Sequence, residues 1–543
     1  MKNHFLNIKI FKIMCGIIFY KDDETLDIYS LLNEISHRGP DHSSYTKVND
    51  YVLGHTRLSI NGVESGSQPI RNEIANTILS VNGEIYNHTS LEEKWGKNFT
   101  GSDCDVLSYI SNPNQLKDIK GMFAFVLYNV ENGDYLITRD RFGIIPLYYG
   151  YSSSGKIMIA SELKVFPKDY NIKIFPPGEY LTNKLTIPRK YTCKIDYFNE
   201  LYTDEKQLFK EIYTKLYNSV KSHLMSEVEY GVLLSGGLDS TIILSLVVEI
   251  YKELNIPINN LKTFSIGMKV KGENVSKDVV IAEKVAQDLG TDHTTFYFTP
   301  EEGIKSLDKV IYHIETYDTT TIRASTPMFL LGKKIKEKYP SVKVVLSGEG
   351  ADELFAGYLY FKKAPNAIEL FNEVNDKVYN LHYYDCLRAN KSMMANGIEV
   401  RVPFLDTDFA EFALSINPIH KECNNSIEKR ILRETFKDII PDYVYTRQKD
   451  QFSDAVSGIN GVSWIDSVKD YADKIKFNIE HPFNKPRTQE ERLYREIYLK
   501  FFDYGTLQLT PWGFSSACST PRVEKWCKSL INDPSGRVLE HYI

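Results

Sequence analysis

Short apolar runs separated by polar turns dominate the first two hundred residues. Four runs have the length and apolar content of β-strands: residues 15–20, 51–60, 77–81 and 123–128. Residues 27–36 fit a helix, which the turn-forming residues 37–41 would end. Asn82-Gly83 follows one of the runs and predicts a tight hairpin turn, and residues 131–133 predict a second hairpin. The pattern therefore predicts a strand-rich α+β region from residue 15 to about 200.

A different pattern begins near residue 206. Helix-like segments (207–225, 277–289, 300–314 and 325–338) alternate with short apolar runs (232–234, 263–267 and 342–346). Alternation of this kind predicts a doubly wound parallel α/β sheet, whose ligands bind beyond the carboxyl ends of the strands. Each apolar run ends in a polar, glycine-bearing turn, so these turns are expected to converge on one crevice. Beyond about residue 360 the sequence predicts mainly helix.

The turn at residues 235–240, Ser-Gly-Gly-Leu-Asp-Ser, has the composition of a phosphate-binding loop. It lies between a predicted strand and a predicted helix, which aims backbone N–H groups and a positive helix end at an anion. No Lys follows the glycines, so the loop suits a released pyrophosphate better than a transferred γ-phosphate. The alternative is an ordinary strand-to-helix turn, because Gly-Gly and Asp-Ser are common turn residues.

A second turn, residues 347–353, carries three carboxylates. Carboxylates beside a polyphosphate require a cation between them, so we expect magnesium held by Asp239 and Asp352. The alternative is a solvated acidic loop that caps the next helix. Arg323, Arg388 and Lys449 are candidates to neutralise a negatively charged substrate, although a lone basic residue is usually a surface residue.

Composition narrows the class of protein. The net charge of −6 gives no indication of nucleic-acid binding, and no apolar run approaches the ~20 residues that span a bilayer. The seven cysteines are scattered without a C-x-x-C pair, which suggests neither a zinc site nor a disulfide framework and fits a reducing cytoplasm. Lysines interrupt the apolar residues of the segment 1–14, so a signal peptide is not expected.

Cys15 stands directly after Met14 at the start of a predicted strand. A lone buried cysteine usually acts as a small hydrophobic residue. In a chain that began at Cys15, however, this residue would carry a free α-amino group. That amine is able to act as general base for its own thiol. Asn82 and Gly83 are suitable oxyanion donors. A substrate amino acid also requires groups for its carboxylate and ammonium, and Arg57 and Asp103 fit these roles.

Many motifs in order along the chain resemble the glutamine-hydrolysing asparagine synthetases of type B. They are residues 14–17 (MCGI), 37–41 (HRGPD), 57–60 (RLSI), 81–87 (VNGEIYN), 101–103 (GSD), 121–125 (GMFAF), 234–240, 347–353 and 395–406 (ANGIEVRVPFLD). The resemblance implies an N-terminal-nucleophile amidotransferase domain, an αββα sandwich, over residues 15–200. It implies an ATP-pyrophosphatase domain, a doubly wound parallel α/β fold with a helical C-terminal part, over residues 206–543.

The resemblance also implies two reactions. Cys15 would attack the side-chain amide of glutamine, with Asn82 and Gly83 holding the oxyanion, and aspartate would attack ATP to give β-aspartyl-AMP, with the assistance of Glu349. Glutamine would lie on Arg57, Leu58, Ser59, Ile60, Asn61, Asn82, Gly83, Glu84 and Asp103. ATP would lie on Leu234, Ser235, Gly236, Gly237, Leu238, Asp239, Ser240, Ile266, Ser347 and Gly348. Arg388 and Lys449 match positions that handle the charged intermediate, and ammonia would travel between the sites inside the protein.

The segment 1–14 departs from the family pattern, because family members expose this Cys at the mature N-terminus. We expect translation to begin at Met14, or the extension to be removed. If the segment is retained, the expectation becomes an ammonia-dependent synthetase with weak glutamine use. The sequence also leaves open a different amide-forming ATP-pyrophosphatase, such as a cyclising β-lactam-synthetase-like enzyme, and an inactive homologue. The family also suggests a homodimer.

Overall fold

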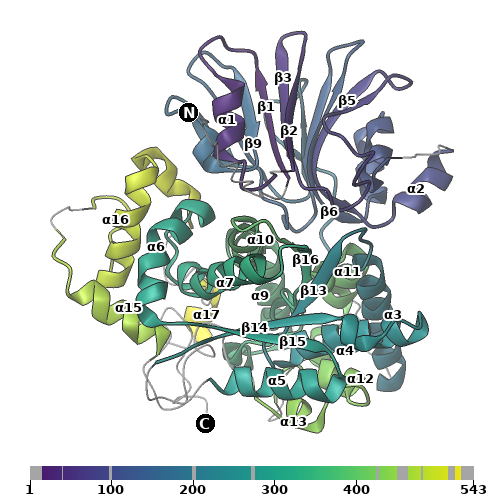
Figure 1. Ribbon diagram of the computed structural model, residues 1–543, viewed down its shortest axis with the longest axis vertical. Coiled ribbons are helices and arrows are strands. Elements are labelled where there is room, and N and C mark those ends of the chain that lie inside the picture. Colours follow the sequence, from purple (N-terminus) through teal and green to yellow (C-terminus); the bar gives the residue numbers. More distant parts are fainter. Residues whose placement is uncertain are drawn as a thin grey trace, which may run out of the picture.

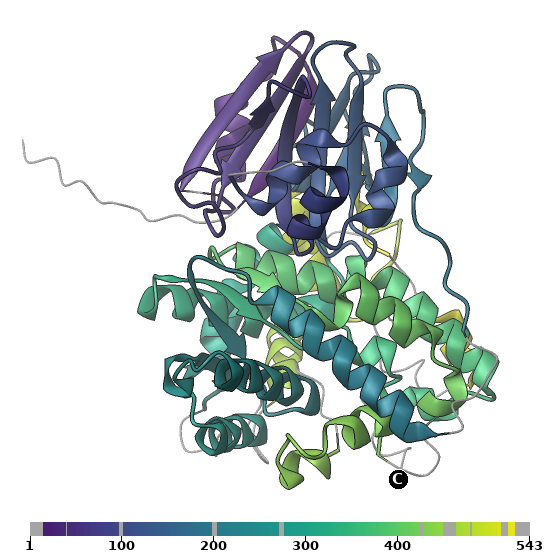
Figure 2. The ribbon, with the colours of Figure 1, turned by 90° about the vertical axis from the view of Figure 1, so that its right-hand side faces the viewer.

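The computed structural model describes residues 15–39, 41–96, 101–197, 204–270, 276–422, 427–448, 463–477, 481–511 and 520–526. In these ranges the chain forms two halves stacked along the long axis of the molecule (Figure 1). Strands β1 to β12 form the upper half, and the elements from α3 onward form the lower half. Figure 2 shows the same division from the side.

Two antiparallel sheets of six strands each form the upper half within the described residues. The first sheet has the order β10 (Asn171–Ile174), β8 (Tyr148–Tyr151), β9 (Ile157–Ala160), β1 (Gly16–Lys21), β3 (Tyr51–Arg57) and β2 (His42–Val48). The second has the order β12 (Arg189–Lys190), β11 (Glu179–Thr182), β7 (Tyr135–Arg139), β6 (Gly121–Asn129), β5 (Thr77–Ile85) and β4 (Ile70–Asn72). The predicted hairpin around residues 131–133 is confirmed as the β6–β7 pair.

The two sheets pack face to face through aromatic side chains. Phe19 of the first sheet meets Tyr135 of the second edge-on, with ring centroids 5.4 Å apart. Helix α1 (Ile28–Glu34) covers the outer face of the first sheet, where Gly54 lacks a side chain and lets the helix approach β3 closely. Helix α2 (His88–Trp95) covers the second sheet, and its Leu91 belongs to that sheet's outer core. The predicted αββα sandwich is therefore confirmed.

The hairpin turn predicted at Asn82-Gly83 is wrong. Both residues lie inside β5, which pairs with β6 from Thr77 to Ile85 without a turn. Gly83 has φ +142°, and a Cβ there would lie 1.9 Å from the carbonyl oxygen of Met122. The glycine thus permits a close approach of two strands, a role that its sequence pattern does not distinguish from a turn.

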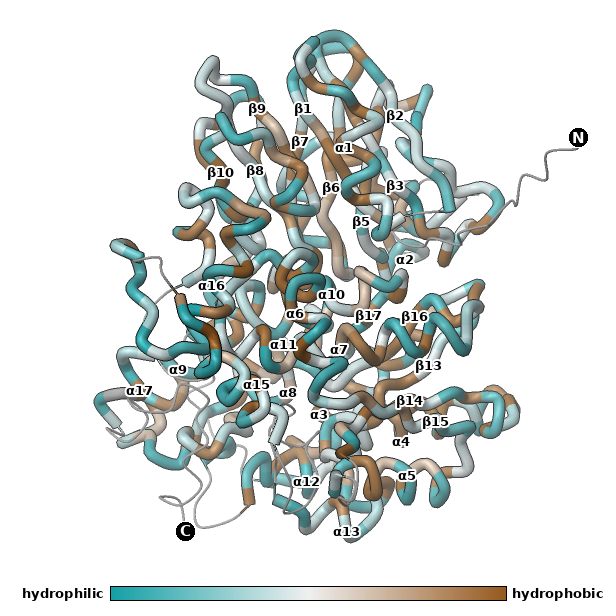
Figure 3. Tube along the Cα trace, turned by 60° about the vertical axis from the view of Figure 1, so that its left-hand side comes forward, coloured by the Kyte–Doolittle hydropathy of each residue, from teal (hydrophilic) through white to brown (hydrophobic). Residues whose placement is uncertain are grey.

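A parallel sheet forms the centre of the lower half, which confirms the doubly wound prediction. Its order is β15 (Asp292–Phe298), β14 (Lys262–Met268), β13 (Glu229–Leu233), β16 (Val342–Leu346) and β17 (Glu399–Arg401). Figure 1 places α7 above this sheet and α4 and α5 below it. Coverage on both faces explains why β16 carries the buried apolar residues Val342, Val344, Val345 and Leu346, and Figure 3 shows hydrophobic (brown) stretches in this part of the chain.

The described α-helices of the lower half agree closely with the predicted segments and extend to the C-terminal part. They are α3 (Glu205–His223), α4 (Leu238–Glu253), α5 (Lys277–Leu289), α6 (Pro300–Ile314), α7 (Thr319–Lys338), α8 (Ala351–Leu354), α9 (Ala367–Asn380), α10 (Asp385–Met394), α11 (Thr407–Ser415), α12 (Arg430–Phe436), α13 (Asp442–Tyr445), α15 (Trp464–Asp473), α16 (Gln489–Phe501) and α17 (Pro521–Trp526). None of the described helices combines the length and the apolar composition needed to cross a bilayer.

A buried cluster of charges joins the two halves. Glu315, at the end of α6, accepts hydrogen bonds from the backbone N–H groups of Leu163 (2.7 Å) and Lys164 (3.0 Å) of the upper half. The ammonium of Lys164 lies 2.8 Å from the same carboxylate, which also binds Lys391 of α10. Burial opposes ionisation of Glu315, but the two ammonium groups hold its pKa below the ordinary value. Glu315 is therefore an anion that anchors the upper half to α10.

Replacing Glu315 by Gln should destabilise the whole molecule. The change leaves Lys391 buried beside a neutral partner, at a cost of about 3–5 kcal/mol. The pKa of Glu315 is lowered in the folded state. The variant's loss of unfolding free energy, relative to the unaltered protein, is therefore fully present above pH ~4.5 and shrinks below it. Calorimetry at pH 7 should show a clear fall in the midpoint of unfolding. The control is Glu337→Gln, which removes only an exposed i,i+4 pair with Lys333; equal shifts for both variants would contradict the prediction.

Candidate active sites

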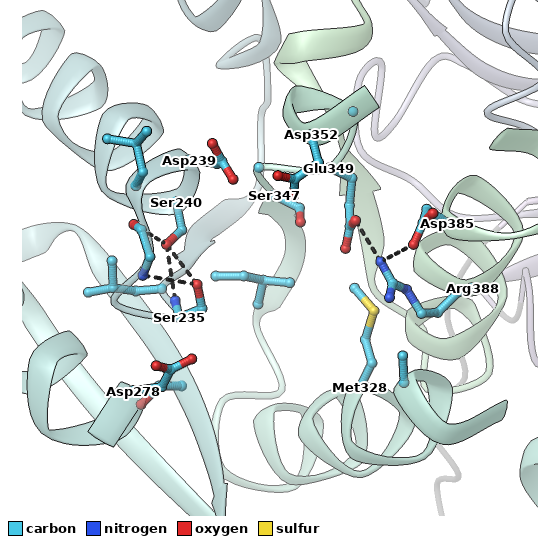
Figure 4. A pocket seen from close by; sticks show the side chains of 18 of the residues that line it. Ser235, Asp239, Ser240, Asp278, Met328, Ser347, Glu349, Asp352, Asp385 and Arg388 are labelled. Atoms are coloured by element: carbon cyan, nitrogen blue, oxygen red, sulfur yellow. Dashed lines mark hydrogen bonds and ion pairs between the residues drawn. The ribbon is translucent and has the colours of Figure 1, made fainter. Parts of the chain in front are cut away.

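A cavity of about 230 Å³ opens at the carboxyl ends of the parallel strands. The three predicted turns meet there: the loop after β13, the end of β14 and the acidic turn after β16. Figure 4 shows their side chains facing one another across this space. Its wall includes Leu234, Ser235, Gly237, Leu238, Asp239, Ser240, Ile266, Ser347, Gly348, Glu349, Asp352 and Arg388, all named from the sequence.

The loop after β13 is held in one conformation by its own serines. Ser240 Oγ accepts a hydrogen bond from the Ser235 N–H at 3.2 Å, and the two hydroxyls lie 3.0 Å apart. Gly236 has φ +75°, and a Cβ there would come within 2.7 Å of the carbonyl oxygen of Asp278. Helix α4 begins at Leu238, so its positive end faces the cavity from directly behind the loop. This is the geometry of an anion cradle.

The two acids expected to hold a metal ion meet at a lysine that sequence reasoning missed. Lys429 Nζ lies 2.8 and 2.7 Å from the two carboxylate oxygens of Asp239 and 2.8 Å from Asp352 Oδ1. Burial opposes the charge of Lys429, but the two aspartates hold its pKa above the ordinary value. The three side chains come from the first turns of α4 and α8 and from the residue before α12. Asp239 and Asp352 therefore lie close together and share one lysine, and the magnesium ion expected between them stays a prediction.

On the opposite wall Arg388 pairs with two acids (Figure 4). Its Nη2 lies 2.6 Å from Glu349 Oε2 and 2.7 Å from Asp385 Oδ1. Burial opposes the guanidinium charge, but these carboxylates keep the Arg388 pKa above its ordinary value. Glu349 and Arg388 thus line the cavity as a charged pair, and their predicted roles stay predictions.

Two of the described residues named for this site from the sequence are not in this wall. Arg323 is buried elsewhere, with its Nε 2.7 Å and its Nη2 2.5 Å from the carboxylate of Glu490. Gly236 supports the loop from behind, where its carbonyl accepts a hydrogen bond from Arg447 at 3.2 Å. Lys449 lies outside the described residues. The cavity instead has Lys429, Arg433 and Arg447 in its wall, cations from segments far along the chain that no local pattern singles out.

Cys15 lies at the start of β1 in the upper half. Its Sγ accepts a hydrogen bond from the Leu58 N–H at 3.2 Å and donates to the Leu58 carbonyl at 3.6 Å. Arg38 Nε donates to the carbonyl oxygen of Cys15 at 3.1 Å. Burial raises the pKa of the Cys15 thiol to about 12 despite the hydrogen bond with Leu58. In the described chain the thiol therefore needs a base before it can act as a nucleophile.

The side-chain amide of Asn82, in the upper half, has an N–H donor without a partner among the described residues. It is only 2 % exposed, and its side-chain Nδ2 has no hydrogen-bond partner within the described part of the chain. Such a buried, unpaired amide is costly unless a ligand accepts from it. Gly83 is its neighbour on β5, so the two predicted oxyanion donors lie side by side on one strand.

The expected amino-acid ligands lie around the same region and are partly paired with protein groups. Arg57 donates to the carbonyl oxygens of Gly62 (2.5 Å) and Val63 (3.2 Å). Glu84 accepts a hydrogen bond from Asn61 Nδ2 at 2.5 Å. Asp103 accepts from the Ile85 N–H at 2.7 Å. Burial raises the pKa of Glu84 and of Asp103, so a cation placed between them would favour their ionised forms.

Residues of the lower half also reach the upper site, which sequence reasoning missed. Arg401 of β17 lies 3.4 Å from Glu84 Oε1, and Asn390 of α10 accepts a hydrogen bond from Arg38. The members of each pair are more than three hundred positions apart in the chain, so spacing gives no signal for them.

Comparison with known proteins gives two family matches. A glutamine amidotransferase domain matches residues 14–198, and asparagine synthase matches residues 211–377 and 372–513. Escherichia coli asparagine synthetase B [glutamine-hydrolyzing] is 44% identical over 97% of this chain and 99% of its own. Asparagine synthetases [glutamine-hydrolyzing] of Arabidopsis thaliana (synthetase 1) and of Pisum sativum nodules are 40% and 41% identical over 96% of this chain and 93% of their own. Among solved structures, a Bacillus subtilis glutamine phosphoribosylpyrophosphate amidotransferase aligns over 53% of this chain and 91% of its own at 17% identity with a TM-score of 0.31, too weak a likeness to carry an argument.

The high pKa of the Cys15 thiol predicts that this thiol is alkylated slowly in the 543-residue chain. Thiolate is the reactive form, and a pKa of about 12 leaves roughly one thiol in ten thousand ionised at pH 8. Iodoacetamide followed by peptide mass spectrometry should label the exposed Cys193 at least about tenfold faster than Cys15. Each unit of pH above 8 should speed the labelling of Cys15 roughly tenfold. Unfolding in urea provides the control, because it should equalise the two rates; equal rates in the folded chain would refute the assignment.

Proposed function

This chain belongs to the glutamine-hydrolysing asparagine synthetases, and from that membership we propose that it makes asparagine from aspartate and glutamine while cleaving ATP to AMP and pyrophosphate. The observation that carries the proposal is the 44% identity over nearly the full length of both chains to a synthetase of this kind. The upper and lower sites supply groups of the right chemistry for the two half-reactions.

Glutamine hydrolysis takes place in the upper half. The Cys15 thiolate attacks the side-chain carbonyl carbon of glutamine, and the α-amine of Cys15 takes the thiol proton. The negative oxygen of the tetrahedral intermediate accepts hydrogen bonds from Asn82 Nδ2 and the Gly83 N–H. Ammonia leaves with that proton, and water then hydrolyses the thioester to glutamate. The unpaired Nδ2 of Asn82 within the described chain supports this role, since an oxyanion would satisfy it.

Recognition of glutamine falls to charged groups of the upper half. Arg57 holds the α-carboxylate, and Asp103 and Glu84 hold the α-ammonium. The raised pKa of both acids supports this role, because a bound ammonium stabilises the carboxylates that burial disfavours. Leu58, Ser59, Ile60 and Asn61 form the remaining wall of the glutamine site.

Aspartate is activated in the lower cavity. An oxygen of its β-carboxylate bonds to the α-phosphorus of ATP, and the bond from that phosphorus to pyrophosphate breaks. The loop 235–240 and the N-terminus of α4 receive the departing pyrophosphate. Adenosine lies on Leu234, Ile266, Ser347 and Gly348. Ammonia then attacks the acyl carbon, loses a proton and expels AMP; Glu349, Arg388 and Lys449 serve the charged intermediate.

Asp239 and Asp352 fit magnesium by their chemistry. Carboxylate oxygens are the ligands that this ion prefers, and it usually takes several others from phosphate and water. The described residues contain no group of three or more acidic, histidine or cysteine side chains that would hold a metal ion unaided. Asp239 and Asp352 would therefore hold the ion together with oxygens of ATP and water, in place of their present contacts with Lys429. The ion supplies charge neutralisation at the phosphates when bound.

Ammonia needs a protected passage between the sites, because in bulk water it is mostly protonated and loses its lone pair. Leu58 and Ile60 of the upper half pack against Val344 and Met394 of the lower half, and Cys15 borders this apolar cluster. An apolar contact reaching from the nucleophile to the parallel sheet supports an internal route. The cysteines in the described ranges are free, which suits the reducing cytoplasm that the sequence predicts.

The direct test is release of pyrophosphate from ATP with aspartate and either glutamine or ammonium. Cys15→Ala should lower glutamine-dependent synthesis by at least about a thousandfold and change ammonium-dependent synthesis by less than about twofold. Cys193→Ala, a change at an exposed cysteine of the upper half, is the control and should retain glutamine use. Absence of aspartate-dependent pyrophosphate with both nitrogen sources would reject the proposed function.

The role of the α-amine predicts that residues 1–14 are absent from the glutamine-using enzyme. An amide nitrogen before Cys15 is not basic and cannot take the thiol proton. Intact-mass analysis of the protein from its natural source should give a chain that begins at Cys15. A retained Met1 together with full glutamine use would overturn this prediction, and a retained Met1 with ammonium use alone would favour an ammonia-dependent synthetase.

A further inference from the structure

Helix α10 lies at the boundary between the two halves, directly beneath the β-sandwich (Figure 1). Arg388 of this helix faces the lower cavity, where it pairs with Glu349. Two residues later, Asn390 faces the upper half, and Met394 packs in the apolar cluster that Cys15 borders. One short helix therefore contacts the surroundings of both sites.

Asn390 contacts the upper half through Arg38. The Arg38 side chain is fully buried and makes three hydrogen bonds: Nε to the Cys15 carbonyl (3.1 Å), Nη1 to Glu162 (2.8 Å) and Nη2 to Asn390 Oδ1 (3.0 Å). A guanidinium is planar, so the direction of any one of its nitrogens fixes the directions of the others. The Asn390 oxygen therefore helps to aim the Nε–H at Cys15.

The carbonyl that Arg38 holds belongs to the same residue as the thiol. Fixing this carbonyl restricts rotation of Cys15 at the start of β1, and with it the direction from which the thiol meets a substrate carbonyl. Misplacement of a reacting group by about 1 Å lowers rates substantially. Asn390 is itself 3 % exposed, so water cannot readily replace its oxygen as the acceptor for Arg38.

We propose that Asn390, a residue of the synthetase half, is a positioning residue for glutamine hydrolysis that acts through Arg38 on Cys15. The inference rests on the proposed function and adds that the glutaminase site is complete only when α10 is docked against it. The contact reaches Cys15 through its own carbonyl and not through the side chains proposed to hold glutamine, so the effect falls on the chemical step and not on the binding of glutamine.

The test uses the enzyme in its glutamine-using form and two substitutions at one position. Asn390→Leu has nearly the same shape but removes the oxygen acceptor, and it should lower kcat for glutamine hydrolysis about tenfold with little change in KM, as expected for a lost hydrogen bond to a charged group. Asn390→Asp keeps the acceptor and should retain kcat within about threefold. Ammonium-dependent synthesis should be unchanged in both, which shows that the lower half is folded.

A matched control comes from the loop after the same helix. Asn396 Nδ2 donates to the carbonyls of Phe329 (3.0 Å) and Ser392 (3.1 Å), both within the lower half. Asn396→Leu therefore removes partly buried hydrogen bonds near α10 without touching Arg38, and it should leave kcat for glutamine hydrolysis unchanged.

Four outcomes would overturn the inference. These are full glutaminase activity in Asn390→Leu, equal losses in Asn390→Leu and Asn390→Asp, a parallel loss of ammonium-dependent synthesis, or an equal defect in Asn396→Leu. Failure of the proposed function has a different signature, because the unaltered enzyme would then hydrolyse no glutamine and form no aspartate-dependent pyrophosphate.

Discussion

Charges buried between the two halves hold the two sites in a fixed relation. Glu315 binds the backbone at Leu163 and Lys164 on one side and Lys391 of α10 on the other. Glu162, the residue directly before Leu163, binds Arg38. Such ions are stable in the interior only while every partner is present, so the interface is either fully docked or strongly destabilised. The two sites depend on this condition, since α10 contributes to one and supports the other.

The charged side chains of the lower cavity are paired with one another. Lys429 is bracketed by Asp239 and Asp352, and Arg388 by Glu349 and Asp385. These pairs satisfy the buried charges of the protein alone. Binding of a nucleotide must exchange some of these partners, so part of the binding free energy goes into rearranging existing ion pairs.

Much of the fold was predictable because local patterns report it. Apolar runs of strand length predicted the strand-rich upper half, the family resemblance implied its two-sheet sandwich, and the alternation of strand and helix predicted the parallel lower sheet. The exception is informative: Asn82-Gly83 has the local signature of a hairpin turn but lies within β5. Its glycine permits a close approach to Met122 of a neighbouring strand, and the dipeptide sequence by itself does not indicate that contact.

Sequence alone determined which turns line the lower cavity, because strand-end loops and their acids, serines and glycines are contiguous in the chain. It named Cys15, Asn82, the loop 235–240 and the acidic turn 347–353. The tertiary structure alone decided which charged side chains lie near these residues. Arg323 pairs with Glu490 outside the cavity wall, whereas Lys429 pairs with Asp239 and Asp352. It also joined Arg38 to Asn390 across 352 positions. Pairings over such separations follow from how the sheets and helices pack, and neither periodicity nor motif spacing encodes them.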